Sequence, residues 1–145
     1  MVESTAVSFV SDRFDLTWPE GADPGASPPW GKDCATFIAE HLPRLGVQVA
    51  PGEPDEQDGG WYFKVRSATG SKLMVFVSWW PVGSKPERNI WVVQVRAWPS
   101  LVPTFLRKTS DQDYRTVCDA INRVIVDEVR ATEVHWLSPE ELSKL

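Results

Sequence analysis

The sequence predicts an α+β fold, a two-layer sandwich in which two helices pack on one face of a mainly antiparallel sheet. Three observations predict it. Three strand-like segments follow one another as a meander, two other segments carry apolar residues at helical spacing, and the 145 residues suit a single domain, 1–145. A meander needs one face covered, and an amphipathic helix needs an apolar surface to cover. The helices should therefore share one side of the sheet.

Residues 1–30 are expected to form a less regular N-terminal segment of this domain. Apolar residues alternate with polar ones at 6–10 and 13–18, which predicts two short strands. Residues 19–31 (PEGADPGASPPWG) are rich in turn-forming residues and lack periodicity, so they predict a loop.

A first helix is expected at 34–45, where apolar residues recur at helical spacing. Asp33 is the expected N-cap residue, because a short carboxylate side chain accepts a backbone hydrogen bond well at that position. Pro43 should end or distort the last turn, and Gly46 should follow the end of the helix.

The centre of the chain predicts strands separated by turns. The expected strands are a short one at 47–50 and three longer ones, the meander, at 61–66, 73–80 and 90–98. An acidic loop rich in Gly and Pro is expected at 51–60. The five-residue turn SATGS at 67–71 is consistent with a hairpin.

The adjacent residues Trp79 and Trp80 must point to opposite faces if they lie on a strand. Phasing the three meander strands by their apolar content places Trp79 on the face that the helices cover. The residues expected on that inward face are Trp61, Phe63, Val65, Leu73, Val75, Val77, Trp79, Trp91, Val93, Val95 and Ala97.

The clearest helix is expected at 111–131, with one apolar face and a polar opposite face. Ser110 is its expected N-cap, and Asp113 at the third position makes a variant of the capping box. A final strand is expected at 133–138, followed by a short terminal helix. That helix begins with residues suited to a helix N-terminus, namely Ser138, Pro139 and Glu141.

Composition restricts the classes of function. The chain has 15 Lys and Arg against 20 Asp and Glu, a net charge of −5, which disfavours duplex DNA as a partner and suits a basic protein. Solubility alone is the other explanation of this charge. Residues 1–10 have neither the basic region nor the long apolar region of a secretory signal, so we expect none, and the longest apolar run, LMVFV, is far too short to span a membrane. We therefore expect a soluble cytoplasmic protein without membrane contact, although export by a signal-free route would give the same sequence features.

The meander face that points away from the helices is the candidate binding surface, because it mixes aromatic and basic residues in a chain with eight tryptophans. Apolar patches that stay exposed usually mark a binding site, and aromatic residues and Arg are enriched at interface hot spots. The alternative is that residues 1–30, residues 99–109 or a second copy of the chain cover this face. The candidate binding residues are Tyr62, Lys64, Arg66, Phe76, Trp80, Arg96 and Trp98.

No residue pattern indicates a catalytic site, a metal site or a cofactor. Cys34 and His41 share the first helix, but seven residues separate them by about 10.5 Å along a helix axis, beyond hydrogen-bonding distance. Cys118 falls on the apolar face of the second helix, and its spacing from Cys34, His41 and His135 matches no zinc motif. The sequence leaves open that the protein is an enzyme whose catalytic residues come together from distant segments.

The sequence therefore favours a small non-enzymatic protein that binds another protein, in the manner of an inhibitor or an antitoxin (immunity) protein. It would use its acidic surface and its aromatic-rich sheet face, and a homodimer would use the same face. The rival function is binding of a small anionic or planar ligand, or of single-stranded nucleic acid, on that face. Aromatic rings can stack on bases while basic residues meet phosphates.

Overall fold

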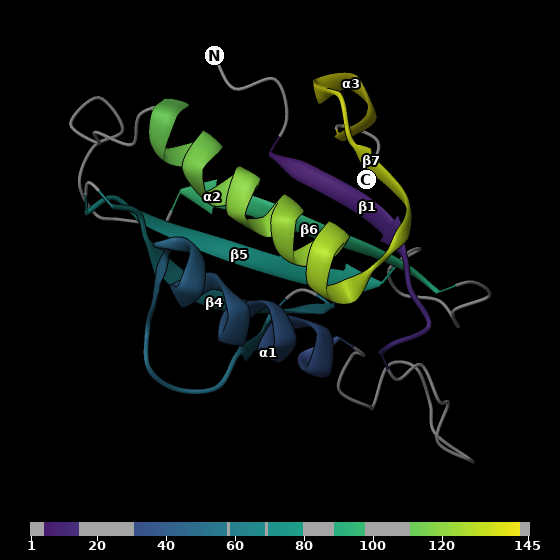
Figure 1. The fold of residues 1–145 in the computed structure, drawn as a ribbon, viewed down its shortest axis with the longest axis horizontal. Coiled ribbons are helices and arrows are strands. Elements are labelled where there is room, and N and C mark those ends of the chain that lie inside the picture. Colours follow the sequence, from purple (N-terminus) through teal and green to yellow (C-terminus); the bar gives the residue numbers. More distant parts are fainter. Residues whose placement is uncertain are drawn as a thin grey trace.

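The computed structural model describes residues 5–14, 31–57, 59–68, 70–79, 89–97 and 111–142. It confirms the two-layer α+β sandwich: helices α1 and α2 lie side by side on one face of a seven-stranded antiparallel sheet (Figure 1). The strand order is β2-β4-β5-β6-β1-β7, and β3 also pairs with β4. The sheet is open, with β2 and β3 along one edge and β7 along the other. None of the helices in the described ranges combines the length and the apolar character that a membrane span requires.

The predicted meander is present, and its phase is correct. Its strands are β4 (Gly60–Arg66), β5 (Lys72–Trp79) and β6 (Ile90–Ala97). Trp79 lies opposite Trp91 in the ladder, and both side chains belong to the buried core beneath the helices. Trp79 therefore points inward as expected, whereas Trp80 lies outside the described residues.

The first predicted strand is confirmed as β1 (Ala6–Val10), and it lies inside the sheet between β6 and β7 (Thr132–Trp136). The prediction of a strand at 13–18 is wrong for residues 13 and 14, the part of this range that the structure describes. Residues 12–14 form a bend, and the ring of Phe14 packs edge-on against Trp91 with 5.6 Å between ring centroids. This aromatic contact with the core takes the place of a ladder partner.

The acidic segment expected as a loop at 51–60 contains a strand, β3 (Asp55–Gln57), which pairs with the start of β4. The short strand expected at 47–50 is β2 (Gln48–Val49), which pairs with the end of β4. A sheet edge exposes backbone donors and acceptors, and charged residues are well tolerated there. The charged and polar residue types of this segment therefore did not indicate that it forms the strand β3.

Helix α1 (Lys32–His41) continues as a 3-10 turn, η1 (Leu42–Leu45). The N-cap residue is Gly31 rather than Asp33, because the chain enters the helix in a left-handed conformation with φ of 116°. Asp33 lies in the first turn, where its Oδ1 accepts a hydrogen bond from the Cys34 N–H at 2.9 Å. Pro43 and Gly46 distort and end the last turn as predicted.

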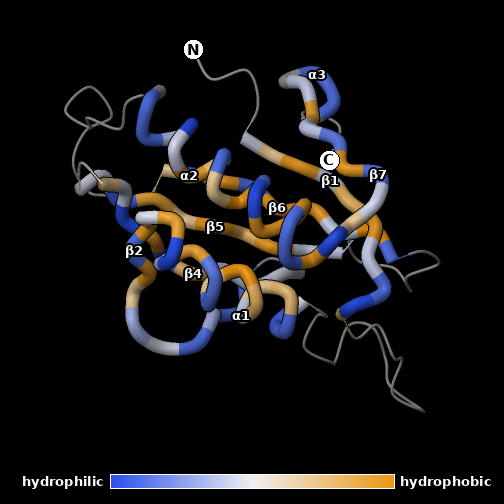
Figure 2. The backbone as a smooth tube through the Cα atoms, in the orientation of Figure 1, coloured by the Kyte–Doolittle hydropathy of each residue, from blue (hydrophilic) through white to orange (hydrophobic). Residues whose placement is uncertain are grey.

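The long helix expected at 111–131 is α2 (Asp111–Arg123), extended by a π-helical turn, η3 (Val124–Val129). Hydrophilic and hydrophobic residues alternate around it, as expected for a helix with one side in a core (Figure 2). The short terminal helix is α3 (Pro139–Leu142). Ser138 caps it as predicted, and Glu141 completes a capping box: the Glu141 N–H donates to Ser138 Oγ and the Ser138 N–H donates to Glu141 Oε1, each at 3.1 Å.

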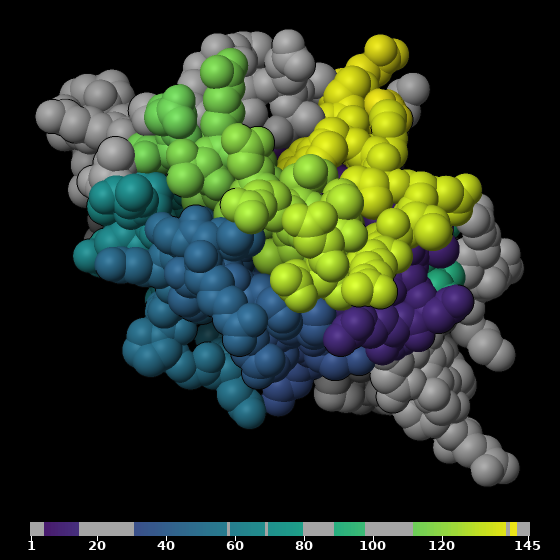
Figure 3. Space-filling view, in the orientation of Figure 1, coloured from purple at the N-terminus to yellow at the C-terminus, as the bar shows by residue number. Residues whose placement is uncertain are grey.

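The hydrophobic core lies between the helices and the sheet, and α1 and α2 cover it in the view of Figure 3. Burying one such aliphatic or aromatic side chain contributes about 1.5–3 kcal/mol. The largest fully buried side chains include Trp91, Phe9, Ile38, Leu42, Leu73, Ile121 and Ile125. The sheet face that could bind something else is therefore the one turned away from this view.

Candidate functional site

The strand register fixes which candidate residues share the face away from the helices. Residues directly opposite in an antiparallel ladder point to the same side. Three successive rows lie on this face. Two of them cross β4, β5 and β6, namely Tyr62 with Phe76 and Gln94, and Lys64 with Met74 and Arg96, while the third joins Arg66 of β4 to Lys72 of β5. The sequence interpretation of the face is consistent with this register.

The aromatic and basic members of this face differ in their exposure. Lys64, Arg66 and Arg96 are exposed and Tyr62 is half-buried, but Phe76 is only 7% exposed. Trp80 and Trp98 lie outside the described residues. Within the described part of the chain, the accessible chemistry of this face is therefore mainly cationic.

Phe76 is buried in part by a close approach to β4. A Cβ atom at Gly60 would lie 2.7 Å from the Phe76 Cζ, so the ring occupies the space that a side chain would need. The Arg96 guanidinium carbon lies 5.2 Å from the centre of the Phe76 ring, within the range of a cation–π contact. The Arg96 Nε also donates to Gln94 Oε1 at 3.0 Å. The Phe76 ring thus contacts the Arg96 guanidinium, and too little of the ring is exposed for a base or another planar ligand to stack on it.

A pocket of about 390 Å³ lies at the end of the sheet where β2, β4 and β5 meet. Its volume falls within the ~300–1,000 Å³ that is usual for small-molecule sites. Three of its residues are cations, and none of the described residues that line it is acidic. The lining residues are Gln48, Val49, Ala50, Pro51, Lys64, Val65, Arg66, Lys72 and Leu73.

The cations of the pocket are held close together by the ladder. Arg66 and Lys72 are directly opposite each other, and Gln48 faces Arg66 from the other side. Like charges in such a pair destabilise a sheet by about 0.2–1 kcal/mol. No ion pair joins Arg66 or Lys72 to another residue in the described ranges. A bound anion would relieve this repulsion.

The hairpin end that carries Arg66 and Lys72 is anchored to the helical layer. Asp113 of α2 is 4% exposed, and its carboxylate accepts hydrogen bonds from Ser67 Oγ at 2.9 Å and from Ser71 Oγ at 2.6 Å. These serines directly follow Arg66 and directly precede Lys72. Asp113 therefore acts as a positioning residue for the two cations, a role that the predicted capping box did not suggest.

The cysteines lie apart from this pocket. Both are buried, and they form no disulfide. Burial, followed by the charge of Asp33, raises the pKa of the Cys34 thiol well above its ordinary value. Burial and then Asp119 raise the pKa of Cys118 to about 12. Both side chains are therefore protonated core groups at neutral pH.

The histidines belong to structural contacts. The His41 ring stacks on Phe37, with 4.3 Å between ring centroids, and His135 lies on β7 beside α3. Among the described residues, no group of three or more His, Cys, Asp or Glu side chains is arranged to hold a metal ion.

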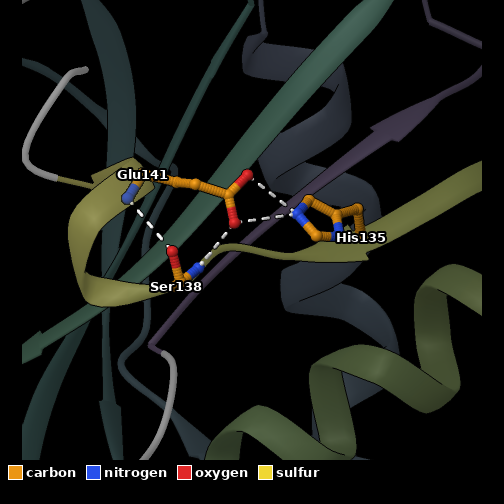
Figure 4. Close-up of polar contacts among 3 residues, drawn as sticks. All are labelled: His135, Ser138 and Glu141. Carbon is orange, nitrogen blue, oxygen red and sulfur yellow. Dashed lines mark hydrogen bonds and ion pairs between the residues drawn. The ribbon is translucent and has the colours of Figure 1, made fainter.

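Ser138, His135 and Glu141 resemble a catalytic triad only in residue type (Figure 4). The His135 Nε2 lies 2.9 Å from Glu141 Oε2, while the Ser138 hydroxyl accepts the N–H of Glu141. A hydrolytic triad needs the histidine between the hydroxyl and the carboxylate, and here the carboxylate occupies the middle. The Ser138 backbone N–H, with further hydrogen bonds from the His135 and Ser138 side chains, lowers the pKa of Glu141. The group therefore caps α3.

Seven of the nine residues that line the pocket did not appear among the candidate binding residues: Gln48, Val49, Ala50, Pro51, Val65, Lys72 and Leu73. A signal for Lys72 was present, because pairing across the turn at 67–71 places it opposite Arg66. Gln48 and Pro51 carry no such signal, since their position depends on how β2 meets the edge of β4. Comparison of the chain with protein-family models, curated proteins and solved structures finds no match.

Proposed function

We propose that the protein binds a small anionic ligand in the pocket formed by β2, β4 and β5. The observation that carries this proposal is the lining itself, in which Arg66 and Lys72 lie directly opposite each other and Lys64 lies on the same face. Pockets of this kind position a ligand by a few polar groups set among apolar ones. Ala50 and Pro51, which are both exposed, supply the apolar part.

The charge of the chain favours a small ligand over a long polyanion. At a net charge of −5, an extended nucleic acid would pass from the basic pocket to surfaces that repel it. A small anion responds to the charges within a screening distance of about 8–10 Å at ordinary ionic strength. The positive charge of the pocket therefore favours a small anionic ligand over single-stranded nucleic acid.

Isothermal titration calorimetry with a panel of phosphates, sulfates and carboxylates tests the proposal. We expect at least one anion to bind at a single site, and the double variant Arg66→Gln/Lys72→Gln to weaken that binding by tenfold or more, because each lost charged contact contributes about 1.5–3 kcal/mol. The matched control is Arg115→Gln/Arg123→Gln, which removes two exposed cations from α2. Equal loss in both double variants, or no binding by any anion, would refute the proposal.

A protein partner is the second proposal, and its specific support is the acidic edge strand. Asp55 and Glu56 of β3 are exposed at a sheet edge, where a basic partner could pair with both the backbone and the charges. An inhibitor-like or antitoxin-like role in the cytoplasm would fit this surface. Capture from the native host should return a stoichiometric basic protein with the parent chain and not with Asp55→Lys/Glu56→Lys. Sedimentation that finds only a homodimer would instead favour self-association.

A further inference from the structure

We infer that the ligand of this pocket is a phosphate monoester whose other end is a compact apolar group. This inference rests on the proposed function and adds the chemical class of the ligand. It follows from three features of the pocket: the number of converging cations, the space beyond them, and the fixed positions of both walls.

The first feature is the charge that the pocket can neutralise. Side chains directly opposite in a ladder have Cβ atoms about 4.5–5.5 Å apart, and residues two apart along a strand are separated by about 6.6 Å. Lys64, Arg66 and Lys72 can therefore reach one group together. A carboxylate brings one negative charge, whereas a phosphate monoester brings between about 1.5 and 2 at neutral pH and three acceptor oxygens. Arg66 can hold two of these oxygens in a bidentate contact.

The second feature is the room left for an organic group. A volume of about 390 Å³ corresponds to about 13 water molecules at ~30 Å³ each, far more than a phosphate group occupies. Beside the cations, the pocket is lined by Ala50 and Pro51, which are both exposed, whereas the Val49 side chain packs against the core on the helix-covered face. Ala50 and Pro51 form an apolar wall for the rest of the ligand, and an inorganic phosphate ion would leave it unused.

The third feature is that both walls are fixed before a ligand arrives. The Ala50 N–H donates to the Lys64 carbonyl at 3.0 Å, which ties the apolar wall to β4. Ser67 and Ser71 tie the cationic wall to the buried Asp113. Because the backbone on both sides of the pocket is already held, the freedom lost on binding is mainly that of the exposed side chains of Lys64, Arg66 and Lys72.

The test is calorimetry with phenyl phosphate, methyl phosphate, inorganic phosphate, phenyl sulfate and benzoate at pH about 7.5, where the monoesters are mostly doubly charged. We expect phenyl phosphate to bind about tenfold or more tightly than phenyl sulfate and benzoate, since one further charged contact changes the dissociation constant by at least that factor. Phenyl phosphate should also bind more tightly than methyl phosphate, because only the ring reaches the apolar wall. Its affinity should fall as the pH drops below the second phosphate pKa of about 6.

Two variants keep the result interpretable. Arg66→Lys keeps the charge and removes the bidentate contact, so it should weaken phenyl phosphate and also benzoate, whose carboxylate accepts the same contact. Arg66→Gln/Lys72→Gln should weaken the binding of every anion by tenfold or more, with the fold checked by circular dichroism. Equal affinity for phenyl phosphate, phenyl sulfate and benzoate would overturn the phosphate inference and leave the proposed function standing. Failure of all five compounds would overturn both, and tighter binding of a 5′-phosphorylated oligonucleotide than of phenyl phosphate would overturn the small-ligand class.

Discussion

The hydrogen bond between Ser71 and Asp113 controls how firmly the pocket end of the sheet is held, and Ser71→Ala tests it. The Ser71 hydroxyl donates to Oδ2 of Asp113 at 2.6 Å, and the carboxylate is 4% exposed. The substitution leaves the backbone bonds of the turn in place, including that from the Ser67 N–H to the Ser71 carbonyl at 2.9 Å. A hydrogen bond to a charged group contributes about 1.5–3 kcal/mol. We therefore expect the free energy of unfolding to fall by about 2 kcal/mol.

Urea denaturation followed by tryptophan fluorescence measures this change. With a denaturant slope of about 2 kcal/mol/M, a loss of about 2 kcal/mol lowers the midpoint by about 1 M. Thr36→Ala is the matched control, because it removes a hydroxyl that bonds to a backbone carbonyl within α1, and its effect should stay within about 0.5 kcal/mol. A midpoint for Ser71→Ala that coincides with that of Thr36→Ala would refute the anchoring of the hairpin by Asp113.

Three other outcomes follow from the described contacts. Gly60→Ala should cost about 1–3 kcal/mol in urea denaturation, because its methyl group would lie 2.5 Å from a carbonyl oxygen of β5; a cost under about 0.5 kcal/mol would contradict that packing. Glu141 has a lowered pKa because the Ser138 N–H bonds to it, so its contribution to folding is complete above its ordinary pKa of 4.5 and disappears as the pH falls through the lowered value. The stability difference between the parent and Glu141→Gln should therefore shrink in acid, and a constant difference would count against the bond. With the pKa of Cys118 raised to about 12 by burial, and with Cys34 fully buried, neither thiol should react with a thiol reagent at about pH 8 until urea unfolds the chain.

Local sequence determines several parts of the fold without help from distant residues. The alternation along the meander identified the inward face that contains Trp79, because a one-residue slip would move every apolar side chain to the other side. The capping box of Ser138 and Glu141 was readable because both partners lie within four residues. Pro43 and Gly46 act through backbone dihedral preferences, which are also local.

The features that sequence reasoning missed depend on contacts between distant residues. Gly31 replaces Asp33 as the N-cap because the entering chain passes the Trp91 ring, which would lie 3.4 Å from a Cβ at that position. The role of Asp113 depends on two serines in a turn that is more than 40 residues earlier in the chain. The pocket forms where β2 and the residues after it meet the edge of β4. The residue types in these segments do not indicate that they lie next to each other.

The placement of β1 between β6 and β7 has a consequence for synthesis of the protein. β1 leaves the ribosome before both of its neighbours, which are strands that begin at Ile90 and at Thr132. At about 5–20 residues per second, the nascent strand waits several seconds for the first neighbour and longer for the second. Its buried residues Val7 and Phe9 are accessible to other chains throughout that interval. Newly made copies are therefore most exposed to aggregation through β1 before β7 emerges.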